Sequence, residues 1–455
     1  MRPTCLVGRN ARHIGTIRIY SISSPGVFHN GAVLVQYKVY EPRRTCSVKI
    51  AVFTDSYRPY VSGVVRSIDT FSTELLALGH EVYIFGPRYY PSQYEDAAAL
   101  SDDDVPATKV FRYWSIPVPM YKGFTAPVPI SAQAELLCAD LGIDLIHSHT
   151  PFAMGTLGAL LARRLRLPLV FTHHTMYHEY VHYIPGVRSA LKEMMLRYVG
   201  AYCRRADLVI TPTPQIRDFA VEAYGLKDKP VKAIPTGIDV DAFGRGDGRA
   251  VRARFAVPED APVLTFVGRL GREKNVELLL KAFKIVVRRR PDAHLMLVGD
   301  GPLREQLEET AAGAGLSGRV HFTGTLTKPE VIDVYHAADL FVIASVTETQ
   351  GLATLEAMAA GLPVAGVNAP GTADMVEHGV QGLLTPEDPE ALAEAALTLL
   401  NDDGQRRAFA ARARARAERF SARNMALELV QAYEEVLAAR APQGAAGRDR
   451  AAAME

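Results

Sequence analysis

The segment Thr347-Glu-Thr-Gln-Gly-Leu-Ala-Thr-Leu-Glu-Ala-Met-Ala-Ala-Gly-Leu-Pro363 connects two short apolar runs, Leu340–Ala344 and Val364–Gly366. Runs of this length and composition are typical of strands buried inside a sheet. Residues 354–360 between them favour a helix, and Gly351 allows the sharp turn that precedes it. The order strand, helix, strand is the repeating unit of a parallel α/β sheet. The segment therefore predicts one βαβ unit of a doubly wound domain.

The same rhythm extends along most of the chain in two series. In the first series, strands are expected at Val48–Asp55, Glu81–Phe85, Leu145–His149, Leu169–His173, Leu208–Thr211 and Val231–Ile234, with helices at Ile68–Leu78 and Gly155–Arg166. In the second, strands are expected at Val263–Val267, His294–Val298 and Val320–Phe322 and at the two runs above, with a helix at Val276–Val287. Two similar halves joined near residues 232–245 predict two Rossmann-like, doubly wound parallel-sheet domains that face each other across a cleft, where a ligand commonly binds.

These patterns give the expected domain boundaries. Residues 1–47 have no sustained period and are expected to be a poorly ordered or spurious extension, with Val48 as an alternative start. Residues 48–232 form the first predicted domain, and residues 233–419 form the second. A helix within 420–440 follows the second sheet and is expected to complete the first domain. Residues 441–455 are rich in Ala, Gly and Arg and are expected to be disordered.

Composition narrows the class of protein. A chain of 455 residues is long for one core, and 48% apolar with 22% charged residues is typical of a globular protein. Its 51 basic and 50 acidic side chains give a net charge of +1, so no whole-chain field attracts nucleic acid. The four cysteines form no CxxC pair, no apolar run approaches the roughly 20 residues that span a bilayer, and no signal peptide is evident. We expect a cytoplasmic protein with reduced cysteines, attached at most peripherally to the inner face of the cell membrane.

Two carboxylates flank the glycine turn at Gly351. Glu348 precedes the expected helix and Glu356 lies inside it, so one could meet the sugar end of a ligand while the other accepts hydrogen bonds from ribose hydroxyls. The backbone N–H groups at Gly351 and Leu352 suit a phosphate, because the start of a helix leaves such donors unpaired. The structural alternative is that Glu348 caps the helix and Glu356 lies on a solvated face.

A second group of candidates follows the strand Val263–Val267. Arg269 and Lys274 could converge on one diphosphate, the first through its planar fork and the second as a point charge. Each could instead be a solvated surface cation. Gly299 and Gly301 form a turn after the next strand, where the backbone could face a base or ribose.

Together these motifs resemble those of the family-four retaining glycosyltransferases, which have the GT-B fold. Glu348 and Glu356 match the E-x7-E motif of that family, and Arg269 and Lys274 match its R-x4-K pair, within a resemblance that covers residues 48 to about 440. The resemblance implies that Arg269 and Lys274 hold the donor pyrophosphate and stabilise the leaving nucleotide. It also implies that Glu356 binds ribose and that Glu348 contacts the transferred sugar.

Two positions of the first half extend this resemblance. His149 matches a histidine near the sugar and its anomeric carbon, although a structural histidine at a strand end is the alternative, and His147 is expected to be structural. Gly63 matches one glycine of a phosphate loop in which many members have two adjacent glycines. This chain has Ser62 before Gly63, which leaves the part played by Ser62 open.

The resemblance also implies a chemistry. The outcome is retention, usually explained by a front-face reaction in which the leaving phosphate helps to deprotonate the acceptor. No acidic metal-binding pattern lies near the motifs, so we expect no metal and no cofactor, with the nucleotide sugar as donor substrate. The carboxylate pair is not expected to work as the acid and nucleophile of a glycosidase.

The acceptor is predicted from the first half. The segment His173-His-Thr-Met-Tyr-His-Glu-Tyr-Val-His-Tyr-Ile-Pro185 looks like the HTMYEDYxHYI segment of bacterial 1,2-diacylglycerol 3-alpha-glucosyltransferases, and Thr349-Gln350 also looks like that group. The resemblance places His174, Tyr177 and Glu179 on the acceptor side. The loop Tyr113–Phe124 is either lipid-facing or packed, and Arg188–Arg205 is either a basic amphipathic helix at an anionic membrane or a core helix.

The leading hypothesis is transfer of a hexose, glucose from UDP-glucose, to diacylglycerol. Phosphatidylinositol, another glycolipid or a soluble sugar are alternative acceptors. A UDP-sugar epimerase of the UDP-N-acetylglucosamine 2-epimerase kind shares the two-domain architecture, but the two motifs argue against it. A third hypothesis is a binding module that has the same fold but has lost catalytic turnover. No nucleic acid is expected as a partner, and no protein partner can be inferred.

Overall fold

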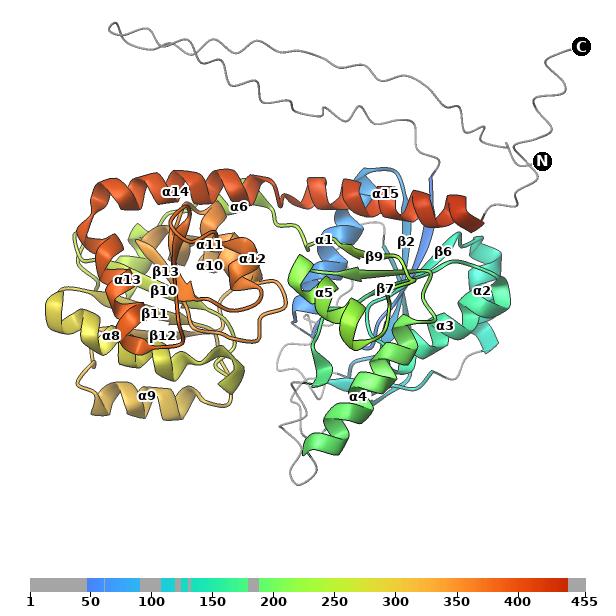
Figure 1. The fold of residues 1–455 in the computed structure, drawn as a ribbon, viewed down its shortest axis with the longest axis horizontal. Helices are drawn as coiled ribbons and strands as arrows, with labels where there is room; N and C mark the ends of the chain where they lie inside the picture. The colour runs from blue at the N-terminus through green and yellow to red at the C-terminus, as the bar shows by residue number, and fades with distance from the viewer. Residues whose placement is uncertain are drawn as a thin grey trace, which may run out of the picture. The chain divides into compact units, whose positions relative to one another are not determined.

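Short runs of Val, Ile, Leu and Phe form the strands of two parallel sheets (Figure 1). The computed structural model describes residues 47–60, 62–90, 108–118, 124–129, 132–178 and 188–440. Residues of β6 (Leu145–Ser148) and β13 (Leu340–Ile343) are buried at every position, as expected for strands covered by helices on both faces. The predicted extension before residue 47 and the predicted tail after residue 440 lie outside the described residues.

The first sheet has seven strands in the order β3-β2-β1-β6-β7-β8-β9, and all its neighbours pair in parallel. Besides β6, its strands are β1 (Lys49–Phe53), β2 (Glu81–Pro87), β3 (Lys109–Tyr113), β7 (Leu169–Thr172), β8 (Leu208–Thr211) and β9 (Val231–Ala233). Its helices are α1 (Gly63–Ala77), α2 (Ala132–Leu141), α3 (Ala153–Leu165), α4 (Arg188–Cys203) and α5 (Pro214–Ala223). A small antiparallel pair, β4 (Ser115–Pro117) and β5 (Thr125–Pro127), completes this half.

The second sheet has six parallel strands in the order β12-β11-β10-β13-β14-β15. Besides β13, these are β10 (Val263–Val267), β11 (His294–Val298), β12 (Val320–Gly324), β14 (Val364–Val367) and β15 (Gly382–Thr385). Its helices are α6 (Val240–Phe243), α7 (Arg249–Arg254), α8 (Val276–Arg289), α9 (Arg304–Gly313), α10 (Lys328–Ala337), α11 (Leu352–Ala359), α12 (Thr372–Met375), α13 (Pro389–Asn401) and α14 (Asp403–Glu418). The 3-10 turn Arg272–Lys274 precedes α8.

The chain crosses between the two sheets twice, and the two crossings are bonded to each other. Ile238 forms a parallel bridge with Ser421, and Ala422 N donates to the Ile238 carbonyl at 2.8 Å. Gly237 is required here, because a Cβ would lie 2.5 Å from the Cα of Ala422. After the second crossing, α15 (Ala422–Arg440) packs against α1 of the first sheet. The residues from Lys49 onward thus cluster into one compact unit that contains both sheets.

The predicted fold class, two doubly wound parallel-sheet domains, is confirmed, while two strands of the parallel sheets and the small pair β4–β5 were not predicted. β3 and β15 lie at the edges of their sheets. Lys109 of β3 is exposed and the other four residues are half-buried, so this strand lacks a continuous apolar run. β15 is fully buried only at its two ends. Edge strands of this kind lack the burial on both faces that makes a parallel strand recognisable in sequence.

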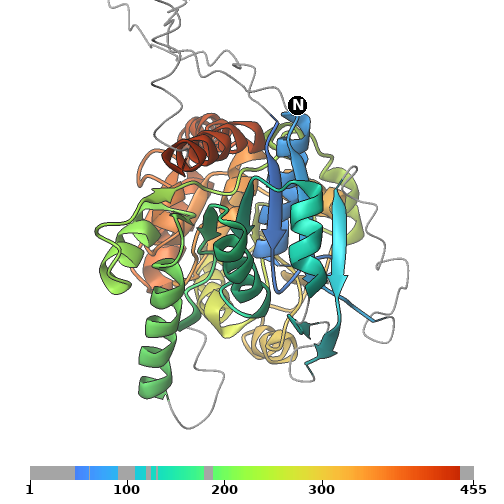
Figure 2. The same ribbon diagram turned by 90° about the vertical axis from the view of Figure 1, so that its right-hand side faces the viewer.

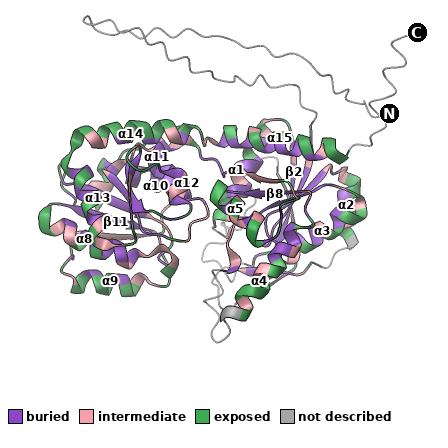
Figure 3. Cartoon of the chain, viewed as in Figure 1, coloured by how far each residue is buried: buried purple, intermediate pink, exposed green. Residues whose placement is uncertain are grey.

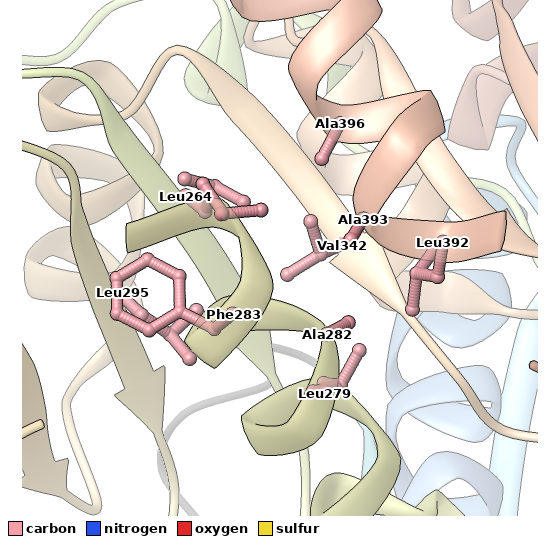
Figure 4. Close-up of a pocket in the computed structure, with 10 residues that line it drawn as sticks. Leu264, Leu279, Ala282, Phe283, Leu295, Val342, Leu392, Ala393 and Ala396 are labelled. Carbon is pink, nitrogen blue, oxygen red and sulfur yellow. The ribbon is translucent and has the colours of Figure 1, made fainter. Parts of the chain in front are cut away.

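The core of the second half is closely packed between the sheet and its helices. Figure 3 shows the buried strands inside and the exposed helix faces outside. A gap with a volume of about 10 Å³ lies between α8, α13 and the sheet, and Figure 4 shows the side chains that line it. Aliphatic and aromatic side chains such as Leu279, Phe283 and Leu392 line this gap. A site without polar partners does not hold an ordered water, so the gap is a packing defect and not a ligand site.

Candidate active site

Strand order fixes where ligands can bind in each sheet. The order reverses between β1 and β6 in the first sheet and between β10 and β13 in the second. Ligands of doubly wound sheets bind at the carboxyl ends of the strands on either side of such a reversal. His149 directly follows β6, Arg269 follows β10, and Glu348 follows β13. The topology therefore brings these predicted residues to the two places where a site is expected.

Lys274 and Glu348 form an ion pair in the second half. Their side chains are 23% and 15% exposed, so the pair is largely shielded from water but still reachable. The loops that carry them are joined, because the Ser345 hydroxyl donates to the Glu273 carbonyl at 3.0 Å. The R-x4-K and E-x7-E motifs are thus in contact through the ion pair of Lys274 with Glu348.

The backbone around Glu348 depends on two glycines. Gly371 has a φ of +77°, and a Cβ on it would lie 2.6 Å from the Cβ of Glu348. Gly351 has a φ of +82° and begins α11 without a side-chain cap. Leu352 is the first residue of this helix. The N–H groups here have no intrahelical partners and can face an anion, which is the role predicted for Gly351 and Leu352.

Glu356 is buried, so the alternative that it lies on a solvated face is wrong. Its Oε1 accepts a hydrogen bond of 2.7 Å from Arg66 of α1, and its Oε2 lies 3.2 Å from the Tyr335 hydroxyl of α10. Burial raises the pKa of Glu356 above its usual value, and the Arg66 charge and the Tyr335 hydrogen bond, which lower it, offset this effect only in part. Neither Arg66 nor Tyr335 was predicted from the sequence.

Arg269, Gly299 and Gly301 belong to two loops that pack on each other. Arg269 is exposed and forms no ion pair with the described residues. Gly299 has a φ of +125°, and a Cβ on it would lie 2.1 Å from the Gly268 carbonyl oxygen. A Cβ on Gly301 would lie 2.5 Å from the Leu270 carbonyl oxygen. The glycines are therefore needed for loop packing, and their predicted contact with the donor stays a prediction.

The first half contributes a cluster of histidines, of which His147 and His149 are buried and His174 is half-buried. His149 Nδ1 lies 2.8 Å from Nε2 of His174, and the backbone N–H of His149 donates to the Phe53 carbonyl at 2.9 Å. His147 is bonded to Tyr433 of α15 and to Thr172, each at 2.7 Å, as expected of a structural histidine. Burial lowers the pKa of His174 to about 3 and that of His149 well below its usual value. The pair at the end of β6 is therefore uncharged near neutral pH.

Asp55 fixes the loop that carries His149. The Thr150 hydroxyl donates to the Asp55 carboxylate, which also accepts from the backbone N–H of Met154 at 2.9 Å. In turn, the backbone N–H of Asp55 donates to the Thr150 hydroxyl at 2.9 Å. The ends of β1 and β6 are thus bonded together. Sequence reasoning treated Asp55 only as part of a polar turn, since its partners lie 95 and 99 positions away.

Tyr177 and Glu179 were predicted on the acceptor side, and Gly63 was predicted in the phosphate loop. The ring of Tyr177 packs edge-on against Phe152 at a centroid distance of 5.0 Å. Glu179 lies outside the described residues. Gly63 is the first residue of α1, and Ser62 caps that helix by accepting from Val65 N at 3.3 Å. This cap gives Ser62 a structural role and leaves the start of α1 open at Gly63.

Gln350 forms hydrogen bonds with the segment where the chain first crosses between the sheets. Its side chain accepts from Thr236 N at 2.8 Å and donates to the Thr236 carbonyl at 2.7 Å. The Thr236 hydroxyl donates to Ser67 of α1 at 2.8 Å. Gln350 therefore connects the loop after β13 to the first crossing and to α1.

Family comparisons agree with this geometry. Residues 61–242 match the model of Glycosyltransferase Family 4, and residues 248–416 match that of Glycosyl transferases group 1. The alpha-monoglucosyldiacylglycerol synthase of Streptococcus pneumoniae is 35% identical over 325 residues, which are 70% of each chain. This chain is a family-four glycosyltransferase. The predicted family membership is confirmed.

Further relatives of this glycosyltransferase include a second synthase of the same name and a transferase of another name. The alpha-monoglucosyldiacylglycerol synthase of Acholeplasma laidlawii is 30% identical over 70% of this chain and 79% of that protein. The sulfoquinovosyl transferase SQD2 of Arabidopsis thaliana is 31% identical over 84% of this chain and 71% of that protein. HepE of Anabaena, solved in complex with UDP-glucose, has a TM-score of 0.69 and 23% identity over 85% of this chain and 99% of that one. This structure supports the GT-B fold.

The described part of the glycosyltransferase contains neither a candidate membrane span nor a candidate metal cluster. None of its helices there has the length and apolar character needed to cross a bilayer. No three His, Cys, Asp or Glu side chains in that part lie together as a metal site would require. The expectation that no metal takes part in the reaction is not tested by this and stays a prediction.

Proposed function

We propose that this glycosyltransferase moves glucose from UDP-glucose to a lipid acceptor, diacylglycerol, with retention of the anomeric configuration. The observation that carries the donor half is the Lys274–Glu348 ion pair beside the uncapped start of α11. A cation, a carboxylate and free N–H groups then meet at the reversal point of the second sheet. The lipid half of the proposal is supported by the two relatives named alpha-monoglucosyldiacylglycerol synthase.

The donor would be held by charge and by the helix start. Lys274 and exposed Arg269 would bind the diphosphate, and the first N–H groups of α11 would add donors. As the bond between the sugar and the diphosphate breaks, negative charge grows on UDP, and these groups stabilise it. Glu348, released from Lys274, would accept hydrogen bonds from sugar hydroxyls, while Glu356 would accept from ribose. In this proposal no divalent ion is required, because protein groups supply the positive charge.

Transfer would follow a front-face course. The acceptor hydroxyl oxygen forms the new bond to the anomeric carbon as the bond to the phosphate oxygen breaks, and the hydroxyl proton passes to that phosphate oxygen. His149 stands at the end of β6, and its contact with His174 fixes the orientation of its ring. A neutral His149 would orient the sugar or the acceptor by a hydrogen bond and would not act as a charged acid.

The lipid acceptor is further supported by apolar side chains exposed in the first half. Trp114 is 60% exposed beside the β4–β5 pair, and Met194 is 57% exposed on α4. The last turns of α4 enter the core through Val199 and Cys203, while its first part projects outward in both Figure 1 and Figure 2. Lys192 and Arg197 are also exposed there. One end of the helix thus packs in the core, as one alternative predicts, and in our proposal the exposed other end meets an anionic surface.

Binding to liposomes tests this surface. We expect the protein to sediment with vesicles that contain phosphatidylglycerol at low salt and to dissociate as salt rises, because the attraction is partly electrostatic. The substitutions Trp114→Ser and Met194→Ser should each reduce the bound fraction several-fold, whereas Leu160→Ser, at an exposed leucine of α3, serves as control. Absence of binding to anionic vesicles at low salt would refute membrane docking.

A screen of donors against acceptors tests the whole proposal. UDP-glucose with diacylglycerol is expected to yield a glucolipid that is extracted into solvent and carries an α linkage. Phosphatidylinositol, a glycolipid and soluble sugars are the competing acceptors. Incubation with the nucleotide sugar alone distinguishes a glycosyltransferase from an epimerase, since an epimerase converts its substrate without an acceptor. If product forms on a soluble sugar but not on any lipid, the proposed lipid acceptor is wrong, while the proposed donor is still supported.

A further inference from the structure

Arg66 is the one cation of the first half that contacts a carboxylate of the predicted donor site in the described part of the chain. It lies on the first turn of α1, one turn after Gly63. Its Nη1 donates to Glu356 Oε1 at 2.7 Å, and the two side chains are 43% and 5% exposed. The Glu356 carboxylate is buried, whereas the Arg66 guanidinium reaches water. Arg66 of the first half therefore contributes to the electrostatic environment of Glu356 in the second.

The contact is supported by its neighbour on α1. Ser67 is buried and accepts a hydrogen bond from the Thr236 hydroxyl, and Thr236 is bonded on its backbone by buried Gln350. Gln350 lies between Glu348 and Gly351 in the loop that precedes α11. Arg66 therefore contacts α11 directly, and Ser67 is linked through Thr236 to the loop before α11. The position of Arg66 beside Glu356 is thus supported by a second set of bonds.

Few other groups act on the Glu356 carboxylate. Tyr335 and Lys328 of α10 are the other groups that lower its pKa, and Lys328 is 52% exposed and 3.6 Å from Asp239. The other helices that pack on α11 are α14, α12 and α6, and their charged side chains named below have other partners or are exposed. On α14, Arg416 donates to the carbonyls of Asp374 and Met375. On α12, Asp374 accepts from Gly371 N, and Asp241 of α6 is exposed.

We infer that Arg66 is a positioning residue of the donor site, which keeps Glu356 ionised and oriented to accept hydrogen bonds from the ribose hydroxyls. This inference rests on the proposed function for the ribose, but the ion pair itself does not. An ionised carboxylate offers acceptors on both oxygens, whereas a protonated one loses an acceptor and becomes a donor. One Glu356 oxygen contacts Arg66 and the other contacts Tyr335, which leaves further lone pairs for a diol.

Removing the guanidinium has a defined electrostatic consequence. Burial already favours the protonated form of Glu356, and Arg66 is the first of the groups that oppose this effect. In Arg66→Gln the pKa of Glu356 therefore rises further. The carboxyl group then binds a proton at a higher pH, and the donor meets a neutral Glu356 over a wider pH range.

The first arm of the test needs no donor. The melting temperature of Arg66→Gln should lie below that of the wild type at pH 8, because an unpaired carboxylate is buried. The difference should shrink as the pH falls, since protonation of Glu356 in the folded variant relieves the cost. Arg423→Gln is the matched control, because Arg423 of α15 is 49% exposed and pairs at 3.6 Å with Glu74 of α1, the helix that carries Arg66. Its melting difference should not follow this pH dependence.

The second arm measures the Kd for UDP by calorimetry between pH 5.5 and 9. Arg66→Gln should bind UDP about tenfold more weakly near neutral pH, with a smaller difference at pH 9, where Glu356 is ionised in both proteins. Arg66→Lys should restore part of the affinity, and Tyr335→Phe should shift the profile in the same direction as Arg66→Gln. Arg423→Gln should bind like the wild type.

The two arms separate failure of this inference from failure of the proposed function. If the wild type does not bind UDP, the proposed function is wrong, and the melting arm alone decides whether Arg66 keeps Glu356 ionised. If the wild type binds UDP and Arg66→Gln keeps its affinity and pH profile, the inference is overturned. A melting difference that is constant with pH would also overturn it.

Discussion

Replacement of Lys274 by Ala is expected to lower kcat/KM by about 10²–10³-fold, because a shielded cation is lost from the place where negative charge develops on the leaving diphosphate. Lys274 is only 23% exposed, so water replaces its charge poorly. The same substitution leaves Glu348 without its cation, and the carboxylate then repels the diphosphate. Both effects act in the same direction.

The measurement is steady-state kinetics of UDP release with saturating acceptor, together with the melting temperature of each variant. Lys284→Ala is a matched control, since Lys284 is an exposed lysine on the neighbouring helix α8 and should leave the rate unchanged. Lys274→Arg keeps the charge and should lose less activity than Lys274→Ala. Near-normal turnover of Lys274→Ala would refute the role assigned to this residue.

Gly299→Ala should be the most destabilising of these single substitutions. The backbone φ of +125° is strained for any residue with a side chain, and the new Cβ would lie 2.1 Å from the Gly268 carbonyl oxygen. Because the obstacle is backbone and not a flexible side chain, the loops after β10 and β11 must separate. Strain of this kind together with overpacking costs about 3 kcal/mol or more.

Urea unfolding of the donor-free protein gives the free energy of unfolding directly. Gly313→Ala is the control, since nothing lies within 4 Å of its added Cβ at the end of α9. That variant should be as stable as the wild type or more stable by about 0.5–1 kcal/mol, because alanine favours a helix. If Gly299→Ala unfolds like the wild type, the packing role of Gly299 is wrong and donor contact becomes the better reason for the glycine.

The fold could be predicted because parallel strands are buried on both faces. β8, β10 and β11 have the predicted bounds, since the runs Leu208–Thr211, Val263–Val267 and His294–Val298 are buried at every position but the last of β10. The edge strands β3 and β15 were not predicted, although β9 and β12, which are also partly buried edge strands, were; partial burial makes a strand harder to recognise without hiding it. The helix predicted from Ile68 begins earlier, at Gly63, because the Ser62 cap lies outside the apolar pattern.

The site was predictable only where its residues belong to local motifs. Glu348 and Lys274 were expected in one site from two motifs, and the ion pair places them together. Arg66 and Glu356 are 290 positions apart, and no periodicity connects them. Gln350 was associated with the acceptor branch from its sequence alone, whereas its side chain bonds Thr236 at the crossing between the sheets. Contacts between distant segments depend on tertiary structure, which local patterns do not encode.

A crystal structure of the complex with UDP tests the central claim most directly. The proposed donor site predicts that the diphosphate contacts Lys274 and Arg269 and the start of α11, with Lys274 released from Glu348 and the ribose hydroxyls on Glu356. UDP bound elsewhere, with the Lys274–Glu348 ion pair intact and Glu356 contacted only by Arg66 and Tyr335, would contradict the account.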